Sequence, residues 1–130
     1  MFDPKKPTAL LLGRWQPWHD GHLALFKRAL AKTGQVVIQV RDVKGSSGGE
    51  GQDDNPFSFD EISKDITEKL FSSGYKVNED FIIQLVPNIT NITYGRGVGY
   101  KIEKESFETD IESISATKIR ESLRDEGKIK

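Results

Sequence analysis

Residues 8–40 read TALLLGRWQPWHDGHLALFKRALAKTGQVVIQV, a pattern that predicts a strand, a helix and a second strand. Residues 8–12 form a continuous apolar run, which is typical of a strand buried on both faces of a parallel sheet. Residues 21–32 carry apolar side chains at helical spacing, and Gly34 ends this predicted helix. Residues 35–40 are rich in β-branched side chains, as strands are.

The rest of the chain continues the alternation of strands and helices. Ser58 and Glu61 form the S-x-x-E pattern of a capping box at the start of a helix. The further elements that we predict are helices at residues 59–72 and 115–124 and strands at residues 81–86, 91–94 and 107–111. This order indicates the α/β class, with residues 1–130 forming a single Rossmann-like domain whose parallel sheet is flanked by helices. Such sheets bind ligands at the carboxyl ends of their strands.

Charge and composition limit the classes of partner. The 19 basic and 20 acidic residues nearly cancel, so we expect no nucleic-acid partner, because binding a phosphate backbone needs a basic excess. The apolar stretch around Leu10 is too short for a signal sequence or a membrane span. There is no cysteine, which excludes thiolate chemistry. We therefore expect a cytoplasmic protein with no membrane partner, and a homo-oligomer remains open.

The segment GRWQPWHDGH, which follows the first predicted strand, contains the only two histidines of the chain. His19 and His22 are three residues apart at a helix start, so both side chains point the same way. Free amide groups and the helix dipole favour an anion there, and Gly21 lets a phosphate approach the backbone. We expect His22 to face that phosphate rather than the core. The alternatives are a metal site, for which no HExxH-like pattern is present, and two ordinary surface histidines.

A second segment, SATKIR, opens the last predicted helix. Ser115 suits the N-cap position, and Lys118 and Arg120 fall in the first turns. Cations there oppose the helix dipole unless a polyphosphate is bound. An ordinary capped amphipathic helix with solvated charges explains the segment equally well when it is taken alone.

Together the two segments resemble the signatures of one enzyme family. GRWQPWHDGH is similar to the GRFQPxHxGH signature of adenylyltransferases in the HxGH nucleotidyltransferase superfamily, and ISATKIR is similar to their ISxTxIR signature. NPFS at residues 55–58 and VPNI at residues 86–89 resemble stretches of archaeal-type nicotinamide-nucleotide adenylyltransferases. The resemblance implies the cytidylyltransferase-like fold and transfer of a nucleotidyl group, with adenylyl from ATP favoured. The acceptor would be a small, phosphorylated molecule, and pyrophosphate would be released.

The resemblance also implies a role for each matching residue. The expected catalytic residues are Arg14, His19, His22, Lys118 and Arg120. The expected nucleotide-binding residues are Gly13, Arg14, Trp15, Gln16, His19, Gly21, His22, Gly95, Arg96, Ile114, Ser115, Thr117 and Arg120. No protein residue is expected to ligate a metal, because Mg²⁺ would be held mostly by water and by the substrate's phosphate oxygens.

The acceptor side is open to several interpretations. Trp15 and Trp18 either pack against the first helix or stack on a base or acceptor ring, and packing is the safer interpretation. Arg41, just past the second predicted strand, pairs either with an acceptor phosphate or with a surface carboxylate. After VPNI the chain departs from the family pattern, so the acceptor is unassigned. The alternative functions are a cytidylyltransferase that uses CTP and a non-catalytic nucleotide-binding module.

The segment KGSSGGEGQDDNP at residues 44–56 has no apolar anchor before its proline. Its composition predicts a mobile surface loop. Because the loop follows the end of the second predicted strand, we expect it to fold over the acceptor when both substrates bind. A passive connection is the competing interpretation.

Overall fold

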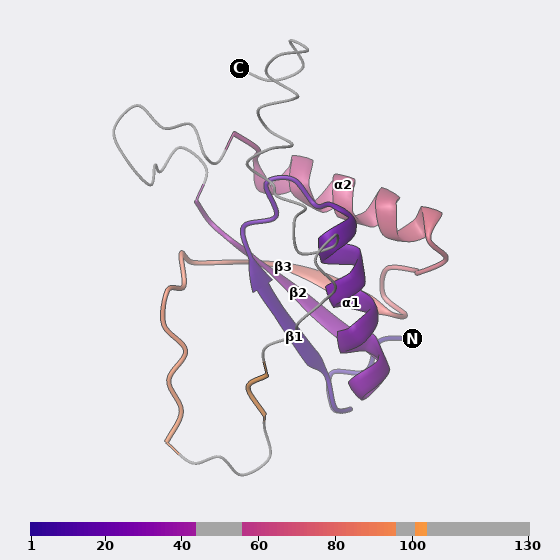
Figure 1. Cartoon of the computed structure of the whole chain (residues 1–130), viewed down its shortest axis with the longest axis vertical. Helices are drawn as coiled ribbons and strands as arrows, with labels where there is room; N and C mark the ends of the chain where they lie inside the picture. The colour runs from indigo at the N-terminus through magenta and orange to yellow at the C-terminus, as the bar shows by residue number, and fades with distance from the viewer. Residues whose placement is uncertain (44–55, 96–100, 104–130) are drawn as a thin grey trace.

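The computed structural model describes residues 1–43, 56–95 and 101–103. Its elements follow the order β1 (Ala9–Gly13), α1 (Asp20–Thr33), β2 (Val36–Arg41), α2 (Phe59–Ser72) and β3 (Phe81–Val86). The three strands form one sheet in the order β1-β2-β3 (Figure 1). Each neighbouring pair is parallel, with Ala9 opposite Val36 and Val36 opposite Phe81. The α/β class and the parallel sheet are thus confirmed.

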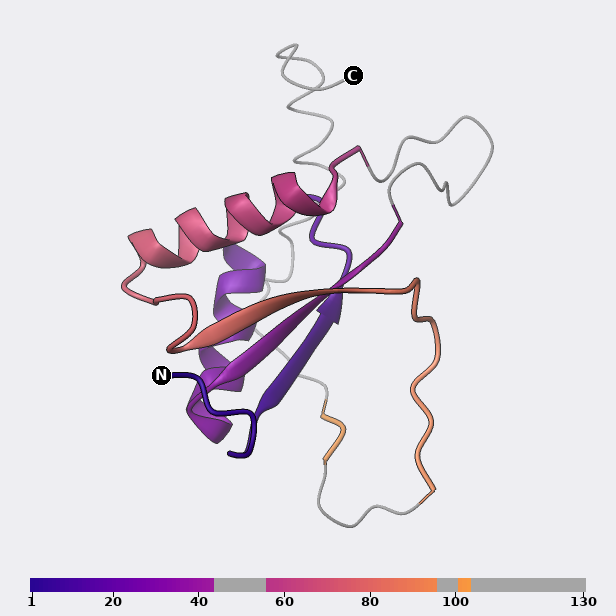
Figure 2. The same ribbon diagram turned by 180° about the vertical axis from the view of Figure 1, so that it is seen from behind.

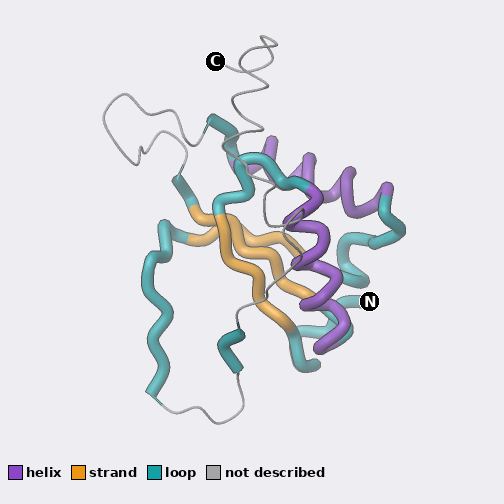
Figure 3. Tube along the Cα trace, in the orientation of Figure 1, coloured by secondary structure: helices purple, strands orange, loops and turns teal. Residues whose placement is uncertain are grey.

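Both helices lie on one side of the sheet, as the two opposite views show (Figures 1 and 2). This follows from two successive crossovers of the same hand, each moving one strand further along the sheet. Residues 87–95 leave the end of β3 on the other side of the sheet (Figure 3). Residues 101–103 return to α1, where the Lys32 ammonium group donates to Glu103 Oε2 at 2.6 Å.

The core lies between the sheet and the two helices. Along β2, Val36, Ile38 and Val40 are buried while the alternate residues are only partly buried, so one face of the strand points to the helices. The helices contribute side chains at helical spacing, and the members of this core cluster include Phe26, Ala29, Ile62, Ile66 and Leu70. A core of this composition holds the carboxyl end of β1 against the start of α1.

The second face of the sheet differs from the sequence prediction. Leu10 of β1 is 47% exposed, although its apolar run suggested a strand covered on both faces. Within the residues that the structure describes, both helices pack on the face of Leu11 and Ile38, so the opposite face has no helix over it. The apolar pattern of β1 therefore has a structural explanation on one face only.

The predicted bounds of the other elements agree closely with the structure. The helix at residues 59–72 and the strand at residues 81–86 have the predicted ends, and each of the other three elements differs by one residue at each end. The short strand predicted at residues 91–94 is wrong, because that segment is irregular and pairs with no described strand. The elements predicted at residues 107–111 and 115–124 lie outside the described residues, as does almost all of the predicted loop at residues 44–56.

Gly13, the last residue of β1, makes room for a side chain of the loop that follows the strand. The left-handed backbone in this loop is found at Trp15, with φ of 53°. A Cβ atom added to Gly13 would lie 2.9 Å from the Cε2 and Cζ2 atoms of the Trp15 ring. Gly13 therefore makes room for the indole that packs back over the end of the strand.

We predict that Gly13→Ala destabilises the protein by about 1–3 kcal/mol, the usual result of overfilling a packed core. The added methyl group would push the Trp15 ring, since a 2.9 Å approach is shorter than any ordinary carbon contact. Urea denaturation followed by tryptophan fluorescence measures the change. Gly95→Ala is the matched control, because its Cβ would meet no described atom within 4 Å. Equal stability of the two variants would contradict this role for Gly13.

Candidate functional site

The loop from Arg14 to His19 joins the carboxyl end of β1 to the first turn of α1. Trp15 and Trp18 are 5% and 2% exposed, and their ring centroids lie 5.1 Å apart. The Trp15 indole N–H donates to the carbonyl group of Gln39 at 3.0 Å, and Trp18 packs edge-on against Phe26. Both tryptophans are therefore packed in the core, as the safer interpretation predicted.

His19 and His22 cap the start of α1 reciprocally. His19 is the N-cap residue, with extended backbone angles, and its Nδ1 atom accepts from the Gly21 amide at 3.0 Å. The Nδ1 atom of His22 accepts in turn from the His19 amide at 3.1 Å. This is the geometry of a capping box, built here from two imidazoles instead of a hydroxyl and a carboxylate. The spacing that suggested an anion site thus also determines where the helix begins.

The capping bonds fix which nitrogen of each ring carries hydrogen. Because both Nδ1 atoms accept hydrogen bonds, each neutral ring carries its hydrogen on Nε2. The rings of His19 and His22 are stacked, with centroids 3.6 Å apart and an angle of 18° between their planes. The pair therefore holds two Nε2–H donors side by side, the arrangement that could bind neighbouring oxygens of a phosphate.

The surroundings of the pair keep both rings neutral. The pKa of His22 is lowered to about 3, mainly by burial and to a lesser extent by electrostatic repulsion from His19 and Lys69. Burial also lowers the pKa of His19, where Asp20 acts in the opposite sense and Lys69 adds to the lowering. At neutral pH both rings therefore offer hydrogen-bond donors and not imidazolium charges.

His22 is more closely packed than the sequence suggested. Its ring meets Trp15 edge-on at a centroid distance of 4.7 Å and lies 5.4 Å from the Trp18 ring. We expected this side chain to face a phosphate and not the core. In the structure the ring packs on the tryptophans and accepts the capping bond from the His19 amide, so it lies closer to the core than expected, and its contact with a phosphate stays a prediction.

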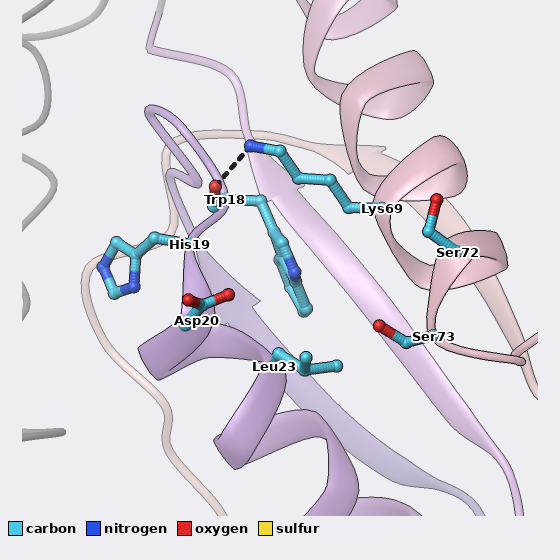
Figure 4. Close-up of a pocket in the computed structure, with 7 residues that line it drawn as sticks. All are labelled: Trp18, His19, Asp20, Leu23, Lys69, Ser72 and Ser73. Atoms are coloured by element: carbon cyan, nitrogen blue, oxygen red, sulfur yellow. Dashed lines mark hydrogen bonds between the residues drawn. The ribbon is translucent and has the colours of Figure 1, made fainter.

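Helix α2 brings a cation to this site, which the sequence analysis missed. The Lys69 ammonium group donates to the Trp18 carbonyl at 2.7 Å and to Asp65 Oδ2 at 3.1 Å. Figure 4 shows Lys69 reaching from α2 to the loop immediately before His19. Lys69 is separated from the histidines by about fifty residues. The sequence therefore placed it in a predicted helix but did not indicate that it would lie near them.

Two cavities meet at Lys69. One, of about 340 Å³, lies between the start of α1 and the last turns of α2 (Figure 4). Its lining residues are Trp18, His19, Asp20, Leu23, Lys69, Ser72 and Ser73. The other, of about 400 Å³, is lined by Trp15, Pro17, Phe57, Glu61, Ile62, Asp65 and Lys69. The loop thus has recesses on both sides of the Lys69–Trp18 contact.

Gln16 ties the loop to the segment that precedes α2. Its side-chain amide donates to the Phe57 carbonyl at 3.1 Å and accepts from the Phe57 amide at 2.9 Å. The side chain is 2% exposed. The buried amide thus matches a backbone donor and acceptor of Phe57, and the expected nucleotide-binding role of Gln16 stays a prediction.

The other expected site residues divide between described and undescribed parts of the chain. Arg14 lies partly exposed at the end of β1, and Gly21 supplies the capping amide. Arg41 donates to Asn88 Oδ1 from Nε and Nη2, at 3.1 and 2.7 Å, so its described partner is an amide and not the carboxylate we considered. Gly95 is exposed in an irregular segment. The expected residues outside the described part are Arg96, Ile114, Ser115, Thr117, Lys118 and Arg120.

The described residues contain neither a cluster of metal ligands nor a helix that could span a membrane. Over those ranges, no three histidine, aspartate or glutamate side chains come together as a metal site. Asp20 is the carboxylate nearest to the histidine pair in sequence, and it is exposed. Neither described helix has the length and apolar character required to cross a bilayer.

Archaeal proteins are similar in sequence to this chain. One, from Methanococcus aeolicus and named nicotinamide-nucleotide adenylyltransferase, is 38% identical over 50 residues, which is 38% of this chain and 27% of the relative. Another of the same name, from Thermoplasma acidophilum, is 37% identical over 81 residues, 59% of this chain and 43% of the relative. The match therefore spans less than half the length of these curated relatives. These similarities confirm the predicted resemblance to the nucleotidyltransferase superfamily.

Part of the chain is also similar to a solved structure. A bifunctional NMN adenylyltransferase/ADP ribose pyrophosphatase from Francisella tularensis, complexed with AMP and a manganese ion, matches with a TM-score of 0.49 and 24% identity. The match covers 63% of this chain and 23% of that protein. No family model matches the chain.

The lowered pKa of His22 predicts that stability falls as the pH drops below about 6.5. The unfolded chain takes up a proton near the ordinary value of 6.5, whereas the folded chain resists protonation until about pH 3. His22 alone should therefore remove about 2 kcal/mol of the free energy of unfolding between pH 7 and pH 5, at about 1.4 kcal/mol per unit. Urea denaturation at several pH values measures this loss.

His22→Asn is the matched variant for this measurement, because asparagine keeps an acceptor at the position of Nδ1 but does not titrate. Its stability should depend less steeply on pH over the same window. Identical pH profiles of the wild type and His22→Asn would show that burial of His22 does not govern the acid sensitivity.

Proposed function

We propose that this protein transfers an adenylyl group from ATP to a small phosphorylated acceptor and releases pyrophosphate. The observation that carries the proposal is the pair of neutral imidazoles stacked at the start of α1, each with its Nε2–H group directed away from the cap. Relatives named nicotinamide-nucleotide adenylyltransferase support the assignment of adenylyl transfer. The identity of the acceptor is left to the experiment.

The reaction requires hydrogen-bond donors to the phosphate oxygens more than it requires a general base. An ionised oxygen of the acceptor phosphate attacks the α-phosphorus of ATP, and the bond from that phosphorus to its bridging oxygen breaks. Pyrophosphate leaves with the electron pair. No proton has to be removed from the acceptor, so neutral histidines suit the chemistry better than histidines with pKa values near 7.

The two imidazoles are suited to charge that grows during this step. Negative charge increases on the oxygens around the α-phosphorus, and a donor held in place before the reaction stabilises that charge without reorganisation. The cap of α1 holds both rings, and burial of Trp15 and Trp18 beneath them limits their movement. The free amides at the start of α1 favour an anion at the same position.

Mg²⁺ would enter this site with the triphosphate. The described residues hold no ready-made cluster of carboxylates for it, and the exposed Asp20 is the acidic side chain next to the histidine pair. This donor set fits an ion that is ligated mainly by phosphate oxygens and water. Bound there, Mg²⁺ would neutralise part of the phosphate charge.

The proposed second half of the site uses residues 114–120. Ser115 and Thr117 would donate to the β- and γ-phosphates, and Lys118 and Arg120 would bind the departing pyrophosphate, as the ISATKIR resemblance implies. Arg14 would lie beside the phosphates, since it follows the end of β1. Gly95 and Arg96 would contact the base and ribose, as the same resemblance implies.

Release of pyrophosphate from ATP, with a panel of phosphorylated acceptors that includes nicotinamide mononucleotide, tests the proposal directly. We expect one acceptor to yield an adenylylated product. Thermal-shift titration with ATP and CTP in parallel identifies the preferred nucleotide, because the stabilisation grows with ligand concentration relative to Kd. A much larger shift with CTP would identify CTP, and not ATP, as the nucleotide substrate. Binding of ATP without turnover on any acceptor would make the protein a nucleotide-binding module.

We predict that His22→Asn lowers kcat by about 100- to 1000-fold, the usual cost of removing one donor to transition-state charge. Asparagine preserves an acceptor for the His19 amide but has no group at the position of Nε2–H. This variant is preferable to alanine, which would also remove contacts with Trp15 and Trp18. Circular dichroism verifies the fold, and a folded variant with unchanged kcat would remove His22 from the mechanism.

A further inference from the structure

Lys69 joins α2 to the histidine pair by a contact that the proposed function has not used. Its ammonium group donates to the Trp18 carbonyl at 2.7 Å, and Trp18 immediately precedes the N-cap residue His19. The same ammonium group pairs with Asp65, one helical turn earlier, at 3.0 Å. The lysine therefore connects a rigid helix to the last loop residue before the cap.

The contact differs from an ordinary surface ion pair. Exposed lysine–carboxylate pairs at i,i+4 spacing contribute little by themselves. Here the carboxylate of Asp65 is only one partner, and the second partner is a backbone carbonyl from a loop far away in sequence. Trp18 is 2% exposed, so two contacts hold the loop at this residue: the Trp18 side chain is buried in the core, and the Trp18 carbonyl accepts from Lys69.

We infer that Lys69 is a positioning residue for the His19–His22 pair: it holds the Trp18 carbonyl so that the two Nε2–H donors keep a fixed direction. The inference deepens the proposed function and rests on it for the effect on catalysis. Its structural part concerns the free protein and needs no substrate.

The charges around the histidine pair determine whether a substitution makes the two rings easier or harder to protonate. Asp20 favours protonation of His19, whereas Lys69 disfavours protonation of both rings and the charge of His19 disfavours that of His22. From α2, Asp65 partly compensates the charge of Lys69, and Glu61 lines the neighbouring cavity with both of them. Among these groups, Lys69 is the one whose removal should make the two rings easier to protonate.

Protonation would disrupt more than the charge balance. An imidazolium ring carries hydrogen on both nitrogens, so its Nδ1 atom could no longer accept the capping bond. The bonds from the Gly21 amide to His19 and from the His19 amide to His22 would both be lost. By disfavouring protonation, Lys69 therefore preserves the cap of α1, the hydrogen on Nε2 of each ring and the direction of the two Nε2–H donors.

The test compares Lys69→Met, Lys69→Arg, Asp65→Asn and Lys64→Met by NMR of the two histidine rings. Methionine keeps the apolar stem of Lys69 but removes its charge and its donors, and arginine restores both. Lys64→Met makes the same chemical change at an exposed position of the same helix. Nitrogen chemical shifts at pH 7 report which ring atom carries hydrogen, and a titration towards lower pH reports the protonation midpoint of His19.

We expect Lys69→Met to raise the His19 midpoint by about 0.3–1 pH unit, the effect of one nearby charge in a partly solvated site. It should also weaken the Nε2–H preference of the rings at pH 7. Lys69→Arg should restore wild-type behaviour, and Lys64→Met should not differ from the wild type. Asp65→Asn should not raise the midpoint, because it leaves the lysine charge in place. An unchanged midpoint and unchanged nitrogen shifts in folded Lys69→Met would overturn the inference.

Kinetics separate this inference from the proposed function. If the protein is an adenylyltransferase, Lys69→Met should lower kcat by about 10-fold with a smaller effect on the KM for ATP, because misdirected donors affect the transition state most. A KM effect alone would mean that Lys69 binds substrate and does not position the histidines. Altered histidine NMR with no activity in the wild type would support the positioning role while rejecting the proposed function.

Discussion

Burial of Trp15 and Trp18 between the sheet and the helices is the constraint on which the site depends. A loop between a strand and a helix is ordinarily free to move, since few of its atoms are buried. Here the two indoles are almost completely buried, and Gly13 has no side chain that would exclude the Trp15 ring. The loop is therefore as firmly placed as the core residues around it, and it can hold functional groups without a ligand.

The histidine pair uses this rigidity. A helix start leaves amide groups without partners, and a polar side chain usually satisfies one of them. In this chain His19 and His22 accept two amide hydrogen bonds with their Nδ1 atoms, so each neutral ring carries its hydrogen on Nε2. The helix cap thus defines the hydrogen positions of both rings, and in the proposed reaction the Nε2–H groups would face the phosphates.

Helix α2 completes the local environment from a distant part of the chain. Gln16 binds both backbone groups of Phe57, and Lys69 binds the carbonyl of Trp18, so the loop is attached to α2 near both ends of that helix. The attachment determines the electrostatics as well as the shape. Burial lowers the pKa of His22 most strongly, and the charge of Lys69 adds to that effect.

The sequence was enough to predict the α/β class, the bounds of α2 and β3, and the position of the histidine pair at a helix start. These features depend on side-chain periodicity and on capping residues that are close together in the chain, so local rules were sufficient. Sequence reasoning failed at the strand predicted for residues 91–94, because strand formation requires a partner that no local pattern supplies. The contacts of Gln16 with Phe57 and of Lys69 with Trp18 could not be predicted from the sequence, since they join residues 41 and 51 positions apart. Such pairings depend on how a helix packs across the sheet, and that packing follows from the whole core and not from the spacing of the two residues.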